Sequence, residues 1–196
     1  PQGRIDIPSK TGREGGVKYT DWAIGNFIER AASRPWFADT VFVIVADHCA
    51  SSSGKSDLPV NRYQIPAIFY SPRHIQPAEF SRLTSQIDLP PTLLGLLNFS
   101  YRSRFMGYDM FDLEVGRERA FISTYQDLGY LRDGKLVKLG PRHNHTVYQP
   151  SLTDGSAREL PPEPELEADA VSWYQAASWA YGHGGLQWLP QQSQNP

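Results

Sequence analysis

The feature that most constrains this sequence is a short apolar run, Val41-Phe42-Val43-Ile44-Val45-Ala46, which ends directly at the polar pair Asp47-His48. The run is rich in β-branched residues from position 40 to 46, and this predicts a strand buried on both faces, as in the centre of a parallel sheet. Ligands of parallel α/β sheets bind beyond the carboxyl ends of the strands. The residues that follow this strand are therefore the first candidates for chemistry.

The pattern around this strand predicts an α/β layer. Apolar residues recur at helical spacing before it, and a second apolar run and a Pro-initiated helix follow it. We predict a helix at 19–32, strands at 40–46 and 67–70, and a helix at 89–97. This alternation is typical of a mainly parallel central sheet with flanking helices, in which the two strands are inner neighbours.

The last third of the chain follows a different pattern. Short runs with strand-like composition are separated by turn residues, and Asp133-Gly134 between alternating residues is a strong hairpin signal. This predicts a small antiparallel sheet beside the main one. We divide the chain into an exposed lead-in (1–16), the α/β region (17–118), the antiparallel subdomain (119–158) and an acidic, then aromatic tail with a helix over 166–181 (159–196).

Composition excludes several classes of protein. The net charge of -2 provides no basic surface for a nucleic-acid partner, and the single cysteine, Cys49, excludes an internal disulfide framework. No apolar run approaches the roughly 18 residues needed to cross a bilayer. Because the chain begins with Pro1, we expect a processed or shortened product, so that a membrane anchor would lie upstream.

Asp47 and His48 are the candidate metal ligands. Both residues follow the predicted strand, where the strict alternation of faces ends, so both side chains can turn toward one ion. A carboxylate with an imidazole suits a divalent cation such as Mn²⁺ or Zn²⁺. By pattern alone, an Asp that caps a turn beside an ordinary loop histidine is the commoner interpretation.

Several stretches, in this order and spacing, resemble the sulfatase family of the alkaline phosphatase superfamily. They cover roughly residues 15 to 125, and the branch they resemble most is that of the lipoteichoic-acid-synthase-like phosphoglycerol transferases. The stretches are Val17 to Asp21, Val43 to His48, Arg62 to Pro72, Ser85 to Leu97 and Met106 to Phe111.

The resemblance implies a divided active site. In the family, the Asp-His pair after this strand binds the catalytic metal, and this role carries over to Asp47 and His48. The family's nucleophile, a Thr or a modified Cys or Ser, and a further acidic ligand lie in the N-terminal half of the domain. No segment here matches them, so we expect no catalytic nucleophile in this chain, an unknown substrate site and no activity of the chain alone.

A phosphate-binding P-loop is the main alternative. The stretch from Cys49 to Ser56 follows a predicted strand and lacks only the first glycine of that motif, which would place Lys55 and Ser56 on a phosphate. A P-loop must open into a helix, however, and Pro59 interrupts any helix that begins here. A third possibility is a binding module that keeps the fold without the chemistry.

Other polar residues have simpler interpretations. Asp88 is predicted to be the N-cap of the helix at 89–97 rather than a catalytic group. Cys49 lacks the Pro and Arg that surround a formylglycine precursor, so we interpret it as an ordinary loop residue. His143 and His145 could share one strand face as metal ligands, but exposed edge positions are commoner. The aromatic tail, which includes Trp188, lacks the basic residues of a membrane-surface helix.

The sequence therefore favours the C-terminal part of a membrane-anchored, metal-dependent phosphoglycerol transferase or related sulfatase-like hydrolase. The expected cofactor is a divalent metal, Mn²⁺ first, with Zn²⁺, Mg²⁺ or Ca²⁺ as alternatives. The expected partner is the N-terminal half of the same domain, without nucleic acid, and the expected location is the cell envelope, with the catalytic domain outside the cytoplasm.

Overall fold

The computed structural model describes residues 5–7 and 12–186, and its contacts divide the chain into two units. Unit 1 consists of Pro1–Ala46 and Pro66–Glu79, and unit 2 consists of Asp47–Ile65 and Phe80–Pro196. Each unit is thus built from two separate stretches of chain. The strand that precedes Asp47 belongs to unit 1, and Asp47 itself is the first residue of unit 2.

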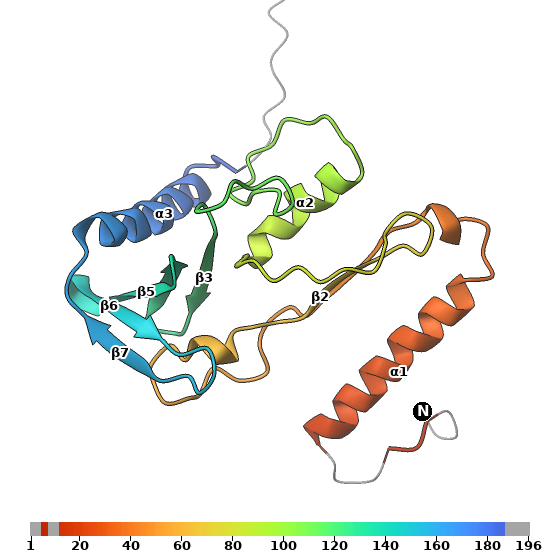
Figure 1. Cartoon of the computed structure of the whole chain (residues 1–196), viewed down its shortest axis with the longest axis horizontal. Coiled ribbons are helices and arrows are strands. Elements are labelled where there is room, and N and C mark those ends of the chain that lie inside the picture. Colours follow the sequence, from red (N-terminus) through yellow and green to blue (C-terminus); the bar gives the residue numbers. More distant parts are fainter. Residues whose placement is uncertain (1–4, 8–11, 187–196) are drawn as a thin grey trace, which may run out of the picture. The chain divides into compact units, whose positions relative to one another are not determined.

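Unit 1 contains a long helix and a two-stranded sheet (Figure 1). Its elements are α1 (Arg13–Ala31), the 3-10 turn η1 (Phe37–Asp39), β1 (Phe42–Val45) and β2 (Ala67–Tyr70). The Phe42 ring, on β1, is the centre of an aromatic cluster, with ring centroids of Phe27, Phe37 and Tyr70 between 5.4 and 6.1 Å away. Aromatic packing of this kind fixes the helix against the strands.

The predicted parallel pairing of these two strands is wrong. β1 and β2 are neighbours, but they run antiparallel, with Phe42 opposite Tyr70 and Val45 opposite Ala67. Parallel neighbours need a crossover, usually an α-helix, and the connection from 46 to 66 holds only the 3-10 turn η2 (Val60–Arg62). Within the described residues the two strands form a sheet of their own, and Ile68 is 52% exposed rather than buried.

Unit 2 is dominated by an antiparallel meander. After η3 (Gln86–Asp88) and α2 (Leu89–Leu96), five strands pair in chain order and are followed by a long helix. The elements are β3 (Arg119–Ser123), β4 (Leu128–Arg132), β5 (Lys135–Gly140), η4 (Pro141–His143), β6 (Asn144–Pro150), β7 (Ala157–Leu160) and α3 (Pro164–Gly182). The predicted antiparallel sheet is therefore present and is larger than expected, while the prediction of a mainly parallel fold fails for every pair of described strands.

The β4–β5 hairpin forms where the sequence predicts it. Asp133 and Gly134 occupy the two turn positions with φ values of 51° and 71°. Two successive positive φ angles match the right-handed twist of the flanking strands, and Asp-Gly is a preferred pair for this turn. The turn therefore sets the register, with Arg132 opposite Lys135.

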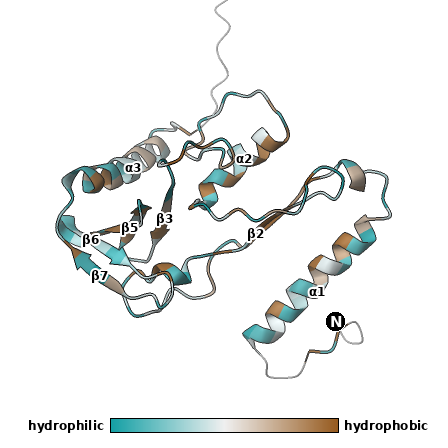
Figure 2. Cartoon of the chain, in the orientation of Figure 1, coloured by the Kyte–Doolittle hydropathy of each residue, from teal (hydrophilic) through white to brown (hydrophobic). Residues whose placement is uncertain are grey.

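Both faces of the five-stranded sheet are covered. On one face, Tyr130 and Val137 pack against Ala170 of α3, and all three are buried. On the other face, Leu131 and Leu136 pack against Leu58, which the segment Asp47–Ile65 contributes. The alternation along β4 and β5 places neighbouring residues on opposite faces. Figure 2 shows β3 and β5 as largely hydrophobic, as burial on both faces requires.

The remaining elements agree in type with the sequence and differ in length. α1 begins at Arg13, earlier than predicted, so part of the expected lead-in is helical, and residues 1–4 and 8–11 lie outside the described residues. α2 and α3 match the predicted helices, while Trp188 lies outside the described part. None of the described helices is long and apolar enough to cross a membrane.

Candidate functional site

Asp47 and His48 are exposed and lie side by side. Their side chains are 88% and 78% exposed, and Asp47 Oδ2 lies 3.6 Å from His48 Nε2. Asp47 Oδ1 also accepts a hydrogen bond from the His48 backbone N–H at 3.0 Å. The two side chains therefore point to the same side, as expected of two ligands of one ion.

The arrangement suits a divalent cation. His48 Nδ1 lies 2.7 Å from the Cys49 carbonyl oxygen, so the tautomer with its proton on Nδ1 donates this hydrogen bond and leaves the Nε2 lone pair free. Metal-binding histidines are commonly oriented by such a bond to a backbone carbonyl. Two donors about 2.1 Å from one ion lie about 3.0–3.5 Å apart, close to the Oδ2–Nε2 separation in this pair. The donor types and the spacing both fit.

The two ligands do not belong to a complete site in the described residues. No group of three or more His, Cys, Asp or Glu side chains that could hold a metal occurs there. His145 lies 3.8 Å from Glu167, and His143 lies in the exposed turn η4 with a φ of 60°. The possible His143–His145 metal pair is thus divided between a turn and a strand, and neither residue joins Asp47 and His48.

The alternative P-loop residues are engaged elsewhere. Lys55 donates to Asp154 at 2.7 Å, and Ser56 donates to the Gly155 carbonyl at 3.0 Å. The hydrogen bond from Lys55 holds the pKa of the Asp154 carboxyl well below its usual range. No helix begins at Ser56, since the next element is the 3-10 turn η2. The backbone cradle and helix N-terminus that a P-loop requires are both missing here.

One side-chain hydrogen bond connects the Asp47 backbone to the next polar cluster. Gln86 Nε2, in η3, donates to the Asp47 carbonyl oxygen at 3.3 Å. η3 is itself closed by a reciprocal capping arrangement, in which Asp88 Oδ2 accepts the Ser85 backbone N–H at 2.9 Å. The segment before α2 therefore supports the backbone that carries the candidate ligands.

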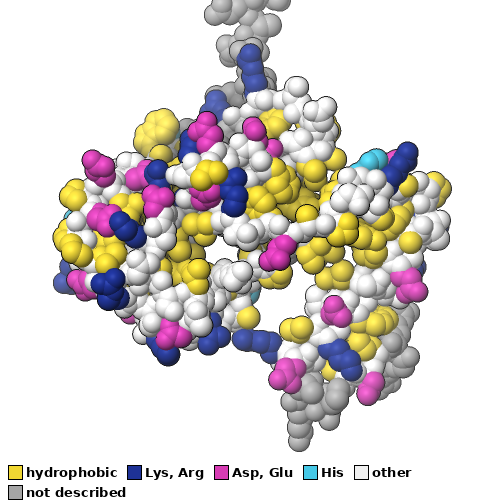
Figure 3. Space-filling model, in the orientation of Figure 1, with side chains coloured by type: hydrophobic (Ala, Val, Ile, Leu, Met, Phe, Trp, Pro, Cys, Tyr) yellow, Lys and Arg dark blue, Asp and Glu magenta, His cyan; other side chains and the backbone are white. Residues whose placement is uncertain are grey.

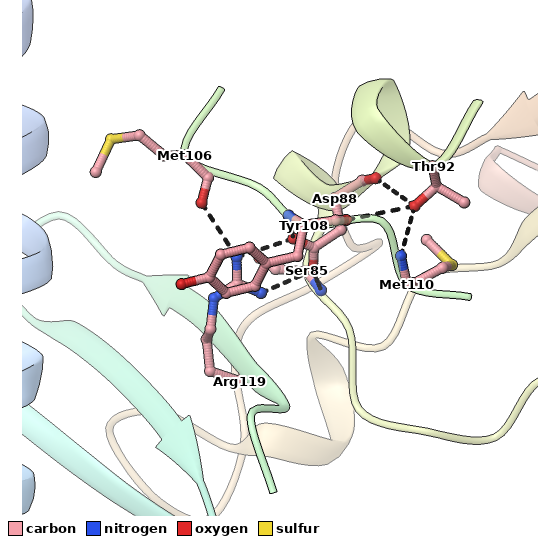
Figure 4. A network of polar contacts seen from close by, with 7 residues as sticks. All are labelled: Ser85, Asp88, Thr92, Met106, Tyr108, Met110 and Arg119. Carbon is pink, nitrogen blue, oxygen red and sulfur yellow. Dashed lines mark hydrogen bonds and ion pairs between the residues drawn. The ribbon is translucent and has the colours of Figure 1, made fainter. Parts of the chain in front are cut away.

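Asp88 occupies the predicted N-cap position of α2, but its side chain forms a buried ion pair instead of a capping bond (Figure 4). Its carboxylate receives two hydrogen bonds of 2.9 Å from the Arg119 guanidinium and one of 2.8 Å from the Tyr108 backbone N–H. Asp88 makes no side-chain capping bond to α2. Both members of the pair are almost fully buried, with exposures of 1% and 2%. A bidentate pair of this kind fixes geometry as well as charge.

Arg119 is a structural centre that the sequence interpretation missed. The face of the Tyr108 ring lies 4.3 Å from its guanidinium carbon, and the rings of Phe121 and Trp173 lie within 5.5 Å. Arginine stacks on aromatic faces in this way when it is desolvated. Its partner Asp88 lies 31 positions earlier in the chain. The nearest sequence signal is an arginine that begins a strand next to Ala120 and Phe121.

A cavity of about 680 Å³ opens within unit 2 beside the loop that carries the ligands. It is lined by Ser52, four residues after His48, and by the turn between β3 and β4 (Ser123, Thr124, Tyr125, Gln126 and Asp127). The lining combines hydroxyl, amide and carboxylate groups with apolar side-chain surface, and the depression is wide open to solvent.

The charges of unit 2 alternate in sign on the visible face. Figure 3 shows Lys and Arg interspersed with Asp and Glu over the five-stranded unit. No broad basic stripe of the kind that binds nucleic acid is visible on that face.

Comparison with known proteins first defines the class. Over 96% of its length the chain is similar to a crystal structure of a protein in the alkaline phosphatase superfamily from Vibrio parahaemolyticus, with 30% sequence identity and a TM-score of 0.87. The chain therefore shares the fold of the corresponding part of that protein. More particularly, residues 9–99 match the model of the sulfatase family. The chain spans 47% of the length of the Vibrio protein.

Proposed function

We propose that this chain forms the C-terminal part of the catalytic domain of a metal-dependent enzyme that hydrolyses or transfers phosphate or sulfate esters. Phosphoglycerol transfer, as in the lipoteichoic-acid-synthase-like branch, is the preferred reaction. The observation that carries the proposal is the paired, exposed Asp47 and His48, 3.6 Å apart, within a region that matches the sulfatase family.

In this proposal Asp47 supplies a carboxylate oxygen and His48 supplies Nε2 to one divalent cation, with Mn²⁺ preferred and Zn²⁺, Mg²⁺ or Ca²⁺ as alternatives. The bound ion would neutralise phosphoryl or sulfuryl oxygens and activate a nucleophile. The hydrogen bond to the Cys49 carbonyl favours the His48 tautomer with its proton on Nδ1. The hydrogen bond from Gln86 positions the Asp47 backbone carbonyl.

The other half of the proposed site comes from a preceding half-domain. Two ligands are too few for a tight divalent site, since ligand number and pre-formed geometry largely determine affinity. The similarity to 47% of a longer protein supports such an arrangement. We propose a nucleophile and a further acidic ligand there, and a membrane anchor that holds the domain in the cell envelope.

The test replaces each ligand in the complete enzyme. Asp47→Ala and His48→Ala should each lower bound metal, measured by mass spectrometry after dialysis, and lower turnover of a phosphodiester substrate by roughly 100-fold or more. Asp57→Ala is the matched control, because Asp57 is an exposed carboxylate in the same loop that pairs only with Lys138 in the described structure.

The circular dichroism spectrum should stay unchanged in all three variants, because both ligands are exposed. Retention of both metal and rate after the Asp47 and His48 substitutions would overturn the proposal. Parallel assays with phosphoglycerol, phosphoethanolamine and sulfate esters identify the transferred group.

A further inference from the structure

A second polar cavity, of about 390 Å³, lies in unit 2 and shares no lining residue with the Asp47–His48 pair. Its walls come from α3, β3, β4 and the loop before β3. The lining consists of Met106, Tyr108, Arg117, Arg119, Tyr130, Arg132, Asp169, Ser172, Trp173 and Ala176. Three arginines in so small a cavity are unusual, because like charges at close range repel.

The arginines are only partly neutralised. Arg119 is paired with Asp88, and Arg132 is paired with Asp169 at 2.8 Å. The Arg117 guanidinium lies over the face of Tyr108, 5.1 Å from the ring centroid, and no ion pair links it to a carboxylate of the described residues. Arg119 and Arg132 thus face three carboxylates, because Asp133 also lies near Arg132. Arg117 is therefore the lining arginine whose charge is available to attract an anion.

Two buried donors in the lining arginines lack acceptors. Arg119 Nε and Arg132 Nε are both inaccessible to solvent and have no hydrogen-bond partner among the described residues. Asp133 Oδ2 lies 3.6 Å from Arg132 Nε, beyond hydrogen-bond distance. Buried donors without acceptors are costly, and arginine is the side chain best suited to a planar or tetrahedral oxyanion.

The cavity also has an apolar wall. Trp173 and Tyr108 pack edge to face at 6.0 Å, and Met106 and Ala176 complete the lining beside them. A flat apolar group can stack on these rings while an oxyanion reaches Arg117. Pockets that combine apolar walls with a few convergent polar groups are typical of small-molecule sites.

We propose that this cavity binds a small organic oxyanion, a phosphate ester or a carboxylate with a flat apolar group. Arg117 and Arg132 receive the anion, and Tyr108 and Trp173 receive the apolar group. Asp169 competes with the ligand for Arg132, so its carboxylate limits the affinity. The site differs from the metal site proposed above and does not depend on it.

The test measures binding of phenyl phosphate to the chain by calorimetry in the presence of EDTA, which removes any contribution of a metal. Arg117→Gln should weaken binding roughly tenfold or more, the usual effect of losing a charge-assisted hydrogen bond. Arg158→Gln is the matched control, because Arg158 is exposed on β7 and does not line the cavity.

Asp169→Asn is the most discriminating variant. It removes the competing negative charge, so phenyl phosphate should bind several-fold more tightly, whereas damage to the fold would weaken binding. Inorganic phosphate and phenol should both bind more weakly than phenyl phosphate, and benzoate in place of phenyl phosphate separates carboxylate from phosphate ligands. Equal binding by the Arg117 and Arg158 variants, or no binding of phenyl phosphate or benzoate, would overturn the proposal.

Discussion

The Asp88–Arg119 pair ties together three segments that are distant in the sequence. The carboxylate reaches β3 through Arg119, the loop before it through Tyr108, and η3 through Ser85. Thr92 extends the network, because its hydroxyl donates to the Asp88 carbonyl at 2.7 Å and accepts from the Met110 backbone N–H at 2.9 Å. The network thus fixes the position of η3, from which Gln86 donates a hydrogen bond to the Asp47 carbonyl oxygen.

Asp88→Asn should destabilise the chain by about 3–5 kcal/mol, because it leaves the Arg119 charge buried without a counter-charge. Urea denaturation monitored by circular dichroism measures the effect. Asp47→Asn, an isosteric change at an exposed carboxylate, should stay within about 0.5 kcal/mol of the parent. Equal midpoints for the two variants would show that Arg119 does not depend on Asp88.

Gly107 permits a close approach between two backbones. A Cβ atom at this position would lie 1.9 Å from the Ile87 carbonyl oxygen. Gly107→Ala should therefore cost about 2–3 kcal/mol or more, because backbone must move to make room. Gly25→Ala is the opposite case: a Cβ there meets nothing within 4 Å, and alanine should stabilise α1 by about 0.5–1 kcal/mol. Thermal denaturation of both variants distinguishes the two effects.

Alkaline pH should weaken the fold through Tyr130. Burial and the hydrogen bond to Asp169 raise the pKa of Tyr130 from 10.0 to about 12, and burial also raises the pKa of Tyr174. Because the folded state holds these protons more tightly, the stabilisation is complete below pH 10 and is lost as the pH rises toward 12. Urea midpoints measured between pH 9 and 12 should fall over this window. In Tyr130→Phe the fall should be smaller, and an unchanged slope would contradict the assignment.

At the scale of elements, the sequence predicts local structure better than pairing. The Asp133-Gly134 turn and the prolines of α2 act through their own backbone angles, so both elements appear where they are predicted. The β-branched run at β1 indicates a strand, but it contains no information on the direction of its neighbour. For a similar reason, the sequence predicts the N-cap position of Asp88 but not its side-chain partner, because Arg119 is distant in the sequence.

The docking of α3 on the sheet depends on a small residue. Ala170 is fully buried against Tyr130 and Val137. Ala170→Leu should cost about 1–3 kcal/mol, because the extra side chain forces the helix away from the sheet. Ala168→Leu, two positions earlier on the exposed side of α3, should change stability by less than about 0.5 kcal/mol. Similar unfolding temperatures for the two variants would argue against this packing.

At the scale of the whole molecule, buried apolar residues are unevenly distributed. In the described structure, nearly all of them belong to unit 2, and Ala31 is the buried hydrophobic residue of unit 1. A two-stranded sheet is also marginal by itself in water. Hydrogen exchange of the chain should therefore be faster in β1 and β2 than in β4 and β5. Equal protection in both sheets would show that unit 1 is stabilised by more than its own contacts.

Unit 2 is built from two separate stretches of chain, and this has a consequence for folding during protein synthesis. Lys55 and Ser56 bond to Asp154 and Gly155, 99 residues later in the chain, and Lys138 pairs with Asp57. At translation rates of 5–20 residues per second, the ribosome takes roughly 5–20 seconds to deliver these partners. During that interval the loop that carries Asp47 and His48 has no sheet to lie on. A nascent chain is thus unable to assemble the candidate metal ligands in place until the chain of the five-stranded sheet, as far as Gly155, has left the exit tunnel.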